Sequence, residues 1–138
     1  MIRAAERVFV DTGAWIALAV VRDSMHERAR HTWTTLLEAG ARPVVSVPVL
    51  LESFTYLQRK VSHDVAARWW ESLASVRFLE RVECSAADVN AAMKFFQRRE
   101  LHKLSLVDAT SFVIMRKHKL RVAFSFDTHF AAAGFRLA

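Results

Sequence analysis

The sequence is poor in the residues that cross-link a chain or loosen it. Among its 138 residues there are one Cys, three Gly and two Pro. A lone Cys84 excludes an intrachain disulfide and suits a reducing compartment, so we expect a cytoplasmic protein. With no Gly/Pro-rich linker, internal repeat or low-complexity segment, residues 1–138 are expected to form a single domain.

The sequence also lacks long apolar runs, and its acidic residues are fewer than its basic residues. No apolar stretch approaches the roughly 20 residues that cross a bilayer, and residues 1–7 lack the apolar core of a signal peptide. We therefore expect neither membrane association nor export. Against 14 Asp and Glu there are 20 Lys and Arg, a net charge of +6, which favours polyanionic partners without bearing on the fold.

Short β-prone runs alternate with segments of helical periodicity. Strands are predicted at residues 8–10, 43–47, 76–82 and 121–126, and helices at 13–21, 24–39, 48–61 and 105–118, with further helices beginning near Ser62 and Ser85. This alternation predicts an α/β fold, a three-layer sandwich with a central, mainly parallel sheet flanked by helices. In such sheets ligands bind beyond the carboxyl ends of the strands.

Four acidic residues, Asp11, Glu52, Asp108 and Asp127, interrupt or end apolar runs in this basic chain. A carboxylate in such surroundings is costly to desolvate unless a counter-charge or hydrogen bonds meet it. If the four meet in space, the natural cation is one that prefers oxygen ligands, such as Mg²⁺ or Mn²⁺. A basic protein holding such a metal indicates phosphodiester chemistry.

Three of these acids have simpler explanations when each is taken alone. Asp11 can cap the helix that follows it, Glu52 lies near a helix N-terminus, where acids are favoured, and Asp127 can form a turn. Taken together, all three follow predicted strands, whose carboxyl ends meet at one edge of a parallel sheet. Clustered there, they would raise one another's pKa unless a divalent ion neutralised them.

Asp108 supports two interpretations that the sequence does not separate. It stands three residues after Ser105, the spacing of a capping box, and the same spacing recurs at Ser85 and Asp88. However, at helical spacing Asp108 shares a stripe with apolar residues, and capping alone does not explain such surroundings. A cap and a site residue are therefore both open.

The order and context of these acids resemble the PIN-domain nucleases, and most closely the VapC-type toxins of bacterial toxin–antitoxin pairs. The resemblance covers essentially the whole chain. It is carried by residues 8–12 (VFVDT), 50–52 (LLE), 104–109 (LSLVDA) and 124–130 (FSFDTHF). Two departures concern substrate contacts: Gly13 stands where a second hydroxyl residue is common, and His129 replaces a frequent Lys or Arg.

This resemblance implies a PIN-like fold and a metal-dependent endoribonuclease. Asp11 and Asp108 would bind Mg²⁺ or Mn²⁺, Glu52 and Asp127 would complete the acidic pocket, and Thr12 matches a small hydroxyl residue that could contact the substrate. It also implies an RNA substrate, a cognate antitoxin protein and a homodimer. The alternatives are a PIN-like RNA-processing nuclease without an antitoxin and a non-catalytic RNA-binding module.

A phosphoryl-transfer protein built on Asp11 is disfavoured by the sequence. Phosphatases of the haloacid-dehalogenase type would need a second Asp two residues later, where Gly13 stands, and response-regulator receivers would need paired acids there. The six His show no i, i+4 pair and no Cys partner at zinc spacing, so no zinc site is expected.

Basic residues and tryptophans provide two further expectations. Candidate phosphate contacts are Arg59 with Lys60, Arg98 with Arg99, and the cations of residues 116–121. All of these fall near expected helix C-termini, where the macrodipole favours cations without any ligand. Trp69 and Trp70 are adjacent and cannot both face one side of a helix, so one is expected at a surface.

Overall fold

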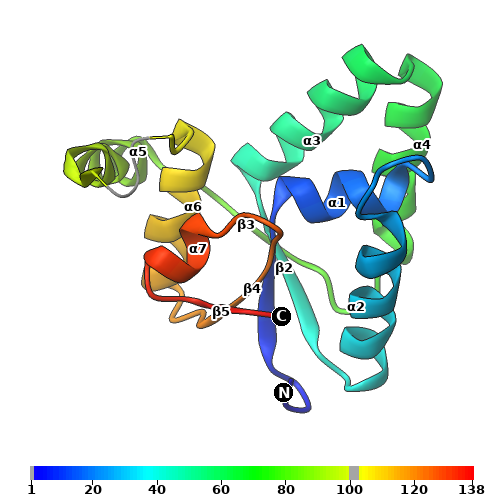
Figure 1. Cartoon of the computed structure of the whole chain (residues 1–138), viewed down its shortest axis with the longest axis horizontal. Coiled ribbons are helices and arrows are strands. Elements are labelled where there is room, and N and C mark those ends of the chain that lie inside the picture. Colours follow the sequence, from blue (N-terminus) through cyan, green and yellow to red (C-terminus); the bar gives the residue numbers. More distant parts are fainter. Residues whose placement is uncertain (1, 100–102) are drawn as a thin grey trace.

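The structure is a computed structural model and describes residues 2–99 and 103–138 (Figure 1). None of the helices in these parts of the chain combines the length and the apolar character needed to traverse a membrane. The elements are β1 (Arg7–Val10), α1 (Thr12–Ala19), α2 (His26–Glu38), β2 (Arg42–Ser46), α3 (Val47–Lys60), α4 (His63–Ser72), the 3₁₀ turn η1 (Leu73–Ser75), β3 (Glu80–Val82), α5 (Ala86–Ala92), the 3₁₀ turn η2 (Met93–Gln97), α6 (Leu106–Lys117), β4 (Val122–Phe124), α7 (His129–Ala132) and β5 (Arg136–Leu137).

The strands form one five-stranded sheet in the order β3-β2-β1-β4-β5. Every neighbouring pair is parallel, and Phe9 in the central strand β1 lies opposite Val44 of β2 and Ala123 of β4. Helices α1, α2 and α4 lie on one side of the sheet, and α5, α6 and α7 lie on the other (Figure 1). The predicted α/β sandwich with a parallel sheet is therefore confirmed.

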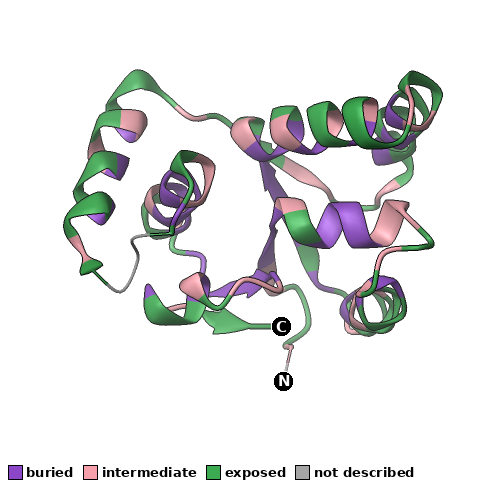
Figure 2. Ribbon diagram, turned by 45° about the horizontal axis from the view of Figure 1, so that its top comes forward, coloured by how far each residue is buried: buried purple, intermediate pink, exposed green. Residues whose placement is uncertain are grey.

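Apolar packing buries both faces of this sheet. On one face Phe9 packs against Phe130, with ring centroids 6.3 Å apart, and Phe130 meets Phe112 edge to face at 4.9 Å. On the other face Trp33 stacks on Phe124, with centroids 6.5 Å apart. Figure 2 shows the buried residues along the strands and on the inward sides of the helices. A sheet covered on both faces leaves its carboxyl edge as the natural place for polar groups.

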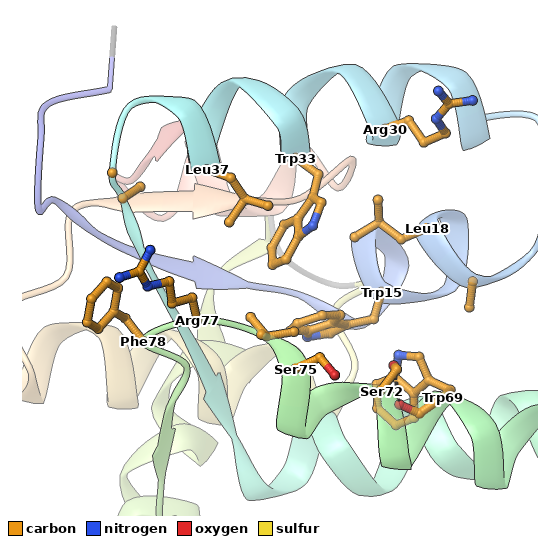
Figure 3. A pocket seen from close by; sticks show the side chains of 14 residues that line it. Trp15, Leu18, Arg30, Trp33, Leu37, Trp69, Ser72, Ser75, Arg77 and Phe78 are labelled. Atoms are coloured by element: carbon orange, nitrogen blue, oxygen red, sulfur yellow. Dashed lines mark hydrogen bonds between the residues drawn. The ribbon is translucent and has the colours of Figure 1, made fainter.

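Three tryptophans line a cavity of about 660 Å³ on the α1, α2 and α4 side. The ring of Trp15 lies 5.5 Å from that of Trp33 and 6.0 Å from that of Trp69 (Figure 3). As predicted, the adjacent tryptophans face differently, because Trp69 is 7% exposed and Trp70 42% exposed. None of the four acids is among the described residues that line this cavity.

Serine side chains begin four of the helices. Ser62, Ser85 and Ser105 accept hydrogen bonds from the backbone N–H groups of their first turns, as the sequence predicts. Ser46 does the same for α3, with Pro48 in the first turn of that helix. Because α3 starts directly after β2, Glu52 is held beside the carboxyl edge of the sheet.

The last predicted strand and the chain end differ from expectation. The strand predicted at residues 121–126 ends at Phe124, because the Ser125 hydroxyl accepts the backbone N–H of Asp127 at 3.0 Å and turns the chain. The β-prone stretch 76–82 is a strand only at its end, and Phe78 adopts a left-handed φ of 60°. The two-residue edge strand β5 was not predicted.

Candidate active site

The four acids are supplied by elements that meet at the carboxyl edge of the sheet. Asp11 follows β1, Asp127 follows β4, Glu52 lies in α3 and Asp108 lies in the first turn of α6. Asp108 and Glu52 both raise the pKa of Asp11, and Asp127 and Glu52 both raise the pKa of Asp108. Such coupling requires proximity, so the structure brings the four carboxylates into one electrostatic cluster.

Asp11 is the most deeply buried member of the cluster. Its side chain is 4% exposed, and burial, followed by the charge of Asp108, raises its pKa to about 7. Oδ2 accepts a hydrogen bond from the Ser125 hydroxyl at 3.0 Å, whereas the buried Oδ1 accepts none from the described residues. Asp11 occupies the N-cap position of α1 but makes no side-chain cap bond, so capping does not explain its presence.

Asp108 satisfies both interpretations that the sequence left open. Its backbone N–H donates to Ser105 Oγ at 3.1 Å, and its Oδ2 accepts from the Ser105 N–H at 3.3 Å, which completes a capping box. Burial nevertheless raises its pKa, and the charges of Asp127 and Glu52 add to that rise. In the second capping box the pKa of Asp88 is lowered, chiefly by hydrogen bonds from Ser85 and with a further contribution from Lys117. The raised pKa of Asp108 therefore comes chiefly from burial, with the charges of Asp127 and Glu52 adding to it, whereas the capping hydrogen bonds from Ser105 act in the opposite direction.

Asp127 and Glu52 are half-buried at the border of the cluster. Oδ1 of Asp127 accepts the backbone N–H of His129 at 2.9 Å, and the ring Nδ1 of His129 lies 2.8 Å from the same oxygen. The turn-forming role considered for Asp127 is therefore present together with its place in the cluster. Glu52 also lines a groove that runs along α3.

Ser125 is a site residue that sequence reasoning missed. Its buried hydroxyl donates to Asp11 and accepts from the Asp127 backbone, so one oxygen fixes both acids. The available signal was a polar residue between Phe124 and Phe126, on the face opposite to both in an alternating run. The hydroxyl of Thr12, next to Asp11, is also buried and has no hydrogen-bond partner among the described residues.

Substituting Ser125 tests this positioning role. Ser125→Ala is expected to lower the free energy of unfolding by about 1–3 kcal/mol, because the N–H of Asp127 and Oδ2 of Asp11 lose a buried partner. Urea denaturation of the wild type and the variant measures the difference. Ser125→Thr retains the hydroxyl and serves as the control; equal unfolding free energies for Ala and wild type would contradict the role.

The donor set of the cluster fits a hard divalent cation. In residues 2–99 and 103–138, no group of three His, Cys, Asp or Glu side chains is arranged to coordinate a metal ion without movement. All the donors are nevertheless carboxylate or hydroxyl oxygens, the type that Mg²⁺ and Mn²⁺ prefer. The unpartnered Oδ1 of Asp11 and its raised pKa show that the ionised carboxylate is poorly stabilised by the described residues, and a cation would stabilise it.

A parallel α/β sheet with an acidic cluster beyond its carboxyl edge defines a protein suited to metal-assisted phosphodiester chemistry. This chain belongs to the PIN-domain family, whose model matches residues 8–136. It is 38% identical to the 23S rRNA-specific endonuclease VapC20 of Mycobacterium tuberculosis over 133 residues, which are 93% of this chain and 95% of the relative. The similarity confirms the prediction of a PIN-domain endoribonuclease of the VapC type.

Solved structures agree with this assignment. The crystal structure of Mycobacterium tuberculosis VapC20, described as a Sarcin-Ricin loop cleaving toxin, matches with a TM-score of 0.81 and 31% identity, covering 93% of this chain and 95% of that one. VapBC2 from Rickettsia felis, bound to a DNA fragment from its promoter, matches with a TM-score of 0.68 and 12% identity over 96% and 97% of the two chains. The second likeness shows the fold alone.

Proposed function

We propose that this protein is a divalent-metal-dependent endoribonuclease that cuts ribosomal RNA, acting as the toxin of a toxin–antitoxin pair. The observation that carries the proposal is the coupled acidic cluster, in which Asp11 has a pKa of about 7 and an unpartnered buried oxygen. Its substrate class is supported by the 38% identity to a 23S rRNA-specific endonuclease. The net charge of +6 suits a polyanionic substrate.

Within this proposal Asp11 and Asp108 are the principal metal ligands, and Glu52 and Asp127 complete the pocket. A bound Mg²⁺ or Mn²⁺ would supply positive charge against the scissile phosphate and acidify an attacking water. Ser125 holds Oδ2 of Asp11 and leaves Oδ1 free to act as a ligand. Burial of Asp11 keeps bulk water from screening the charge of its carboxylate.

Cleavage of ribosomal RNA tests the activity directly. We expect the purified protein to cut 23S rRNA at one predominant position with Mn²⁺ or Mg²⁺, and to leave it intact with EDTA. Primer extension on naked rRNA and on intact ribosomes would locate the cut. Asp11→Ala prepared in parallel should give no product, which excludes a contaminating nuclease. Metal-independent cleavage, or equal cleavage by the variant, would contradict the proposal.

The antitoxin and the homodimer are proposed from the VapC-type class of the chain. A nuclease of ordinary RNA processing would need no inhibitor, and the PIN-domain endonuclease Utp24, with a TM-score of 0.55 and 18% identity, shares only the fold. Genomic context distinguishes the two: a small adjacent reading frame whose product abolishes cleavage in the rRNA assay supports the toxin, and its absence supports RNA processing. Light scattering of the purified protein measures the homodimer.

A further inference from the structure

A groove of about 660 Å³ extends along α3 from the acidic cluster. We call it the α3 groove. Glu52 lines it from the second turn of α3, and Arg59 and Lys60 line it from the last turn of that helix. The groove is completed by segments distant in sequence. Its lining residues are Val47, Pro48, Leu51, Glu52, Thr55, Tyr56, Arg59, Lys60, Cys84, Val89 and Val107.

The charges along this groove favour an anionic occupant that reaches the acidic cluster. The macrodipole explains why Arg59 and Lys60 end a helix, but it does not explain why they line the same groove as Glu52. Glu52 and Arg59 are seven residues apart on α3, which is about 10 Å along the axis, or the rise of about three stacked nucleotides. A strand with a phosphate at the two cations would therefore extend into the cluster.

Most of the other residues that line the groove are apolar, and one of them offers an accessible aromatic ring. Leu51 is 60% exposed and Tyr56 is 44% exposed, so the chain leaves both side chains open to a ligand. An exposed ring beside paired cations is the combination that binds single-stranded nucleic acid, because bases stack on the ring and phosphates meet the cations.

We propose that the α3 groove binds the unpaired RNA strand on one side of the cleaved bond, with a phosphate at Arg59 and Lys60 and a base stacked on Tyr56. This assignment rests on the proposed function, RNA cleavage at the acidic cluster. It makes Tyr56, Arg59 and Lys60 substrate-binding residues.

Direct binding of a short, fluorescently labelled, single-stranded RNA tests the groove without requiring turnover. All proteins carry Asp108→Asn, so that the probe stays intact during anisotropy titrations at several salt concentrations. The groove variants are Arg59→Ala with Lys60→Ala, Tyr56→Ala and Tyr56→Phe. The matched control is Arg22→Ala with Arg68→Ala, which removes two exposed cations outside the groove.

The double groove variant is expected to bind about tenfold more weakly at low salt, with the slope of log K against log salt reduced by about 0.7, the value for one lost phosphate contact on a single strand. Tyr56→Ala should also lose about tenfold, while Tyr56→Phe, which keeps the ring, stays near the parent. The matched control should keep the parent's affinity and slope.

Two outcomes would overturn the assignment. Unchanged RNA affinity in the double groove variant excludes the groove as an RNA site, and a shift of that variant from dimer to monomer on size exclusion would then identify it as a contact between two copies. Equal weakening by the matched control would show that only net charge matters. Neither result bears on rRNA cleavage by the wild type. The groove assignment can therefore be wrong while the proposed nuclease activity is correct.

Discussion

Asp108→Asn is expected to reduce RNA cleavage on the order of a thousandfold, which corresponds to about 4 kcal/mol of transition-state stabilisation. The amide keeps the size of the side chain and removes the negative charge of Asp108. That charge interacts with the charges of Asp11, Glu52 and Asp127. Initial rates on 23S rRNA with saturating Mn²⁺ measure the loss.

The second capping box provides the matched control for this substitution. Asp88→Asn changes the same helix position, next to a serine with the same pair of hydrogen bonds. Asp88 takes part in a salt bridge, with Lys117 Nζ 3.4 Å from its Oδ1, and it lies outside the acidic cluster. Cleavage by Asp88→Asn should therefore match the wild type. Comparable losses in both variants would assign the effect to helix capping and remove Asp108 from the site.

The sequence was informative wherever a local pattern and the tertiary structure required the same thing. Asp11 and Asp127 could be assigned to strand ends because each follows a short apolar run that is typical of a buried strand. The serine caps before α4, α5 and α6 were equally local. Asp108 shows the limit of such reasoning, since a capping box and an acidic cluster require the same residue at the same position.

Features that depend on distant segments were beyond prediction. Ser125 contacts Asp11 across 114 residues of sequence and so links it to Asp127, and nothing in the neighbourhood of Ser125 indicates that contact. The two residues of β5 are too few to show a period, and they become a strand only because β4 offers a free edge. Likewise, Arg59 and Lys60 look like any basic helix end until Cys84, Val89 and Val107 complete the groove that joins them to Glu52.

Asp11→Asn is expected to stabilise the metal-free protein above neutral pH while abolishing cleavage. Folding raises the pKa of Asp11 from its ordinary 3.8 to about 7. Below pH 3.8 the group is protonated in both the folded and the unfolded chain, and its contribution to stability is complete. Between these two pKa values only the folded chain keeps the proton, so wild-type stability falls as pH rises and the contribution is lost above about pH 7.

Asparagine mimics the protonated carboxyl at every pH, so the variant should not show this fall. In EDTA at pH 8, the free energy of unfolding of Asp11→Asn should exceed that of the wild type by a few kcal/mol, since a tenfold change in proton affinity corresponds to about 1.4 kcal/mol. Urea denaturation at intervals from pH 4 to 8 measures the difference. Mn²⁺ should restore the stability of the wild type at pH 8 and leave the variant unchanged, because only the wild type has a buried charge to neutralise.

Asp88→Asn provides the opposite sign in the same experiment. Hydrogen bonds from Ser85 hold the pKa of Asp88 below its ordinary value, so its carboxylate stabilises the fold at neutral pH and loses that effect as pH falls through the folded pKa. This variant should therefore be less stable than the wild type at pH 8. If the free energies of unfolding of the wild type and Asp11→Asn ran parallel from pH 4 to 8, burial would not raise the pKa of Asp11. The argument for a cation at this site would then lose its physical basis.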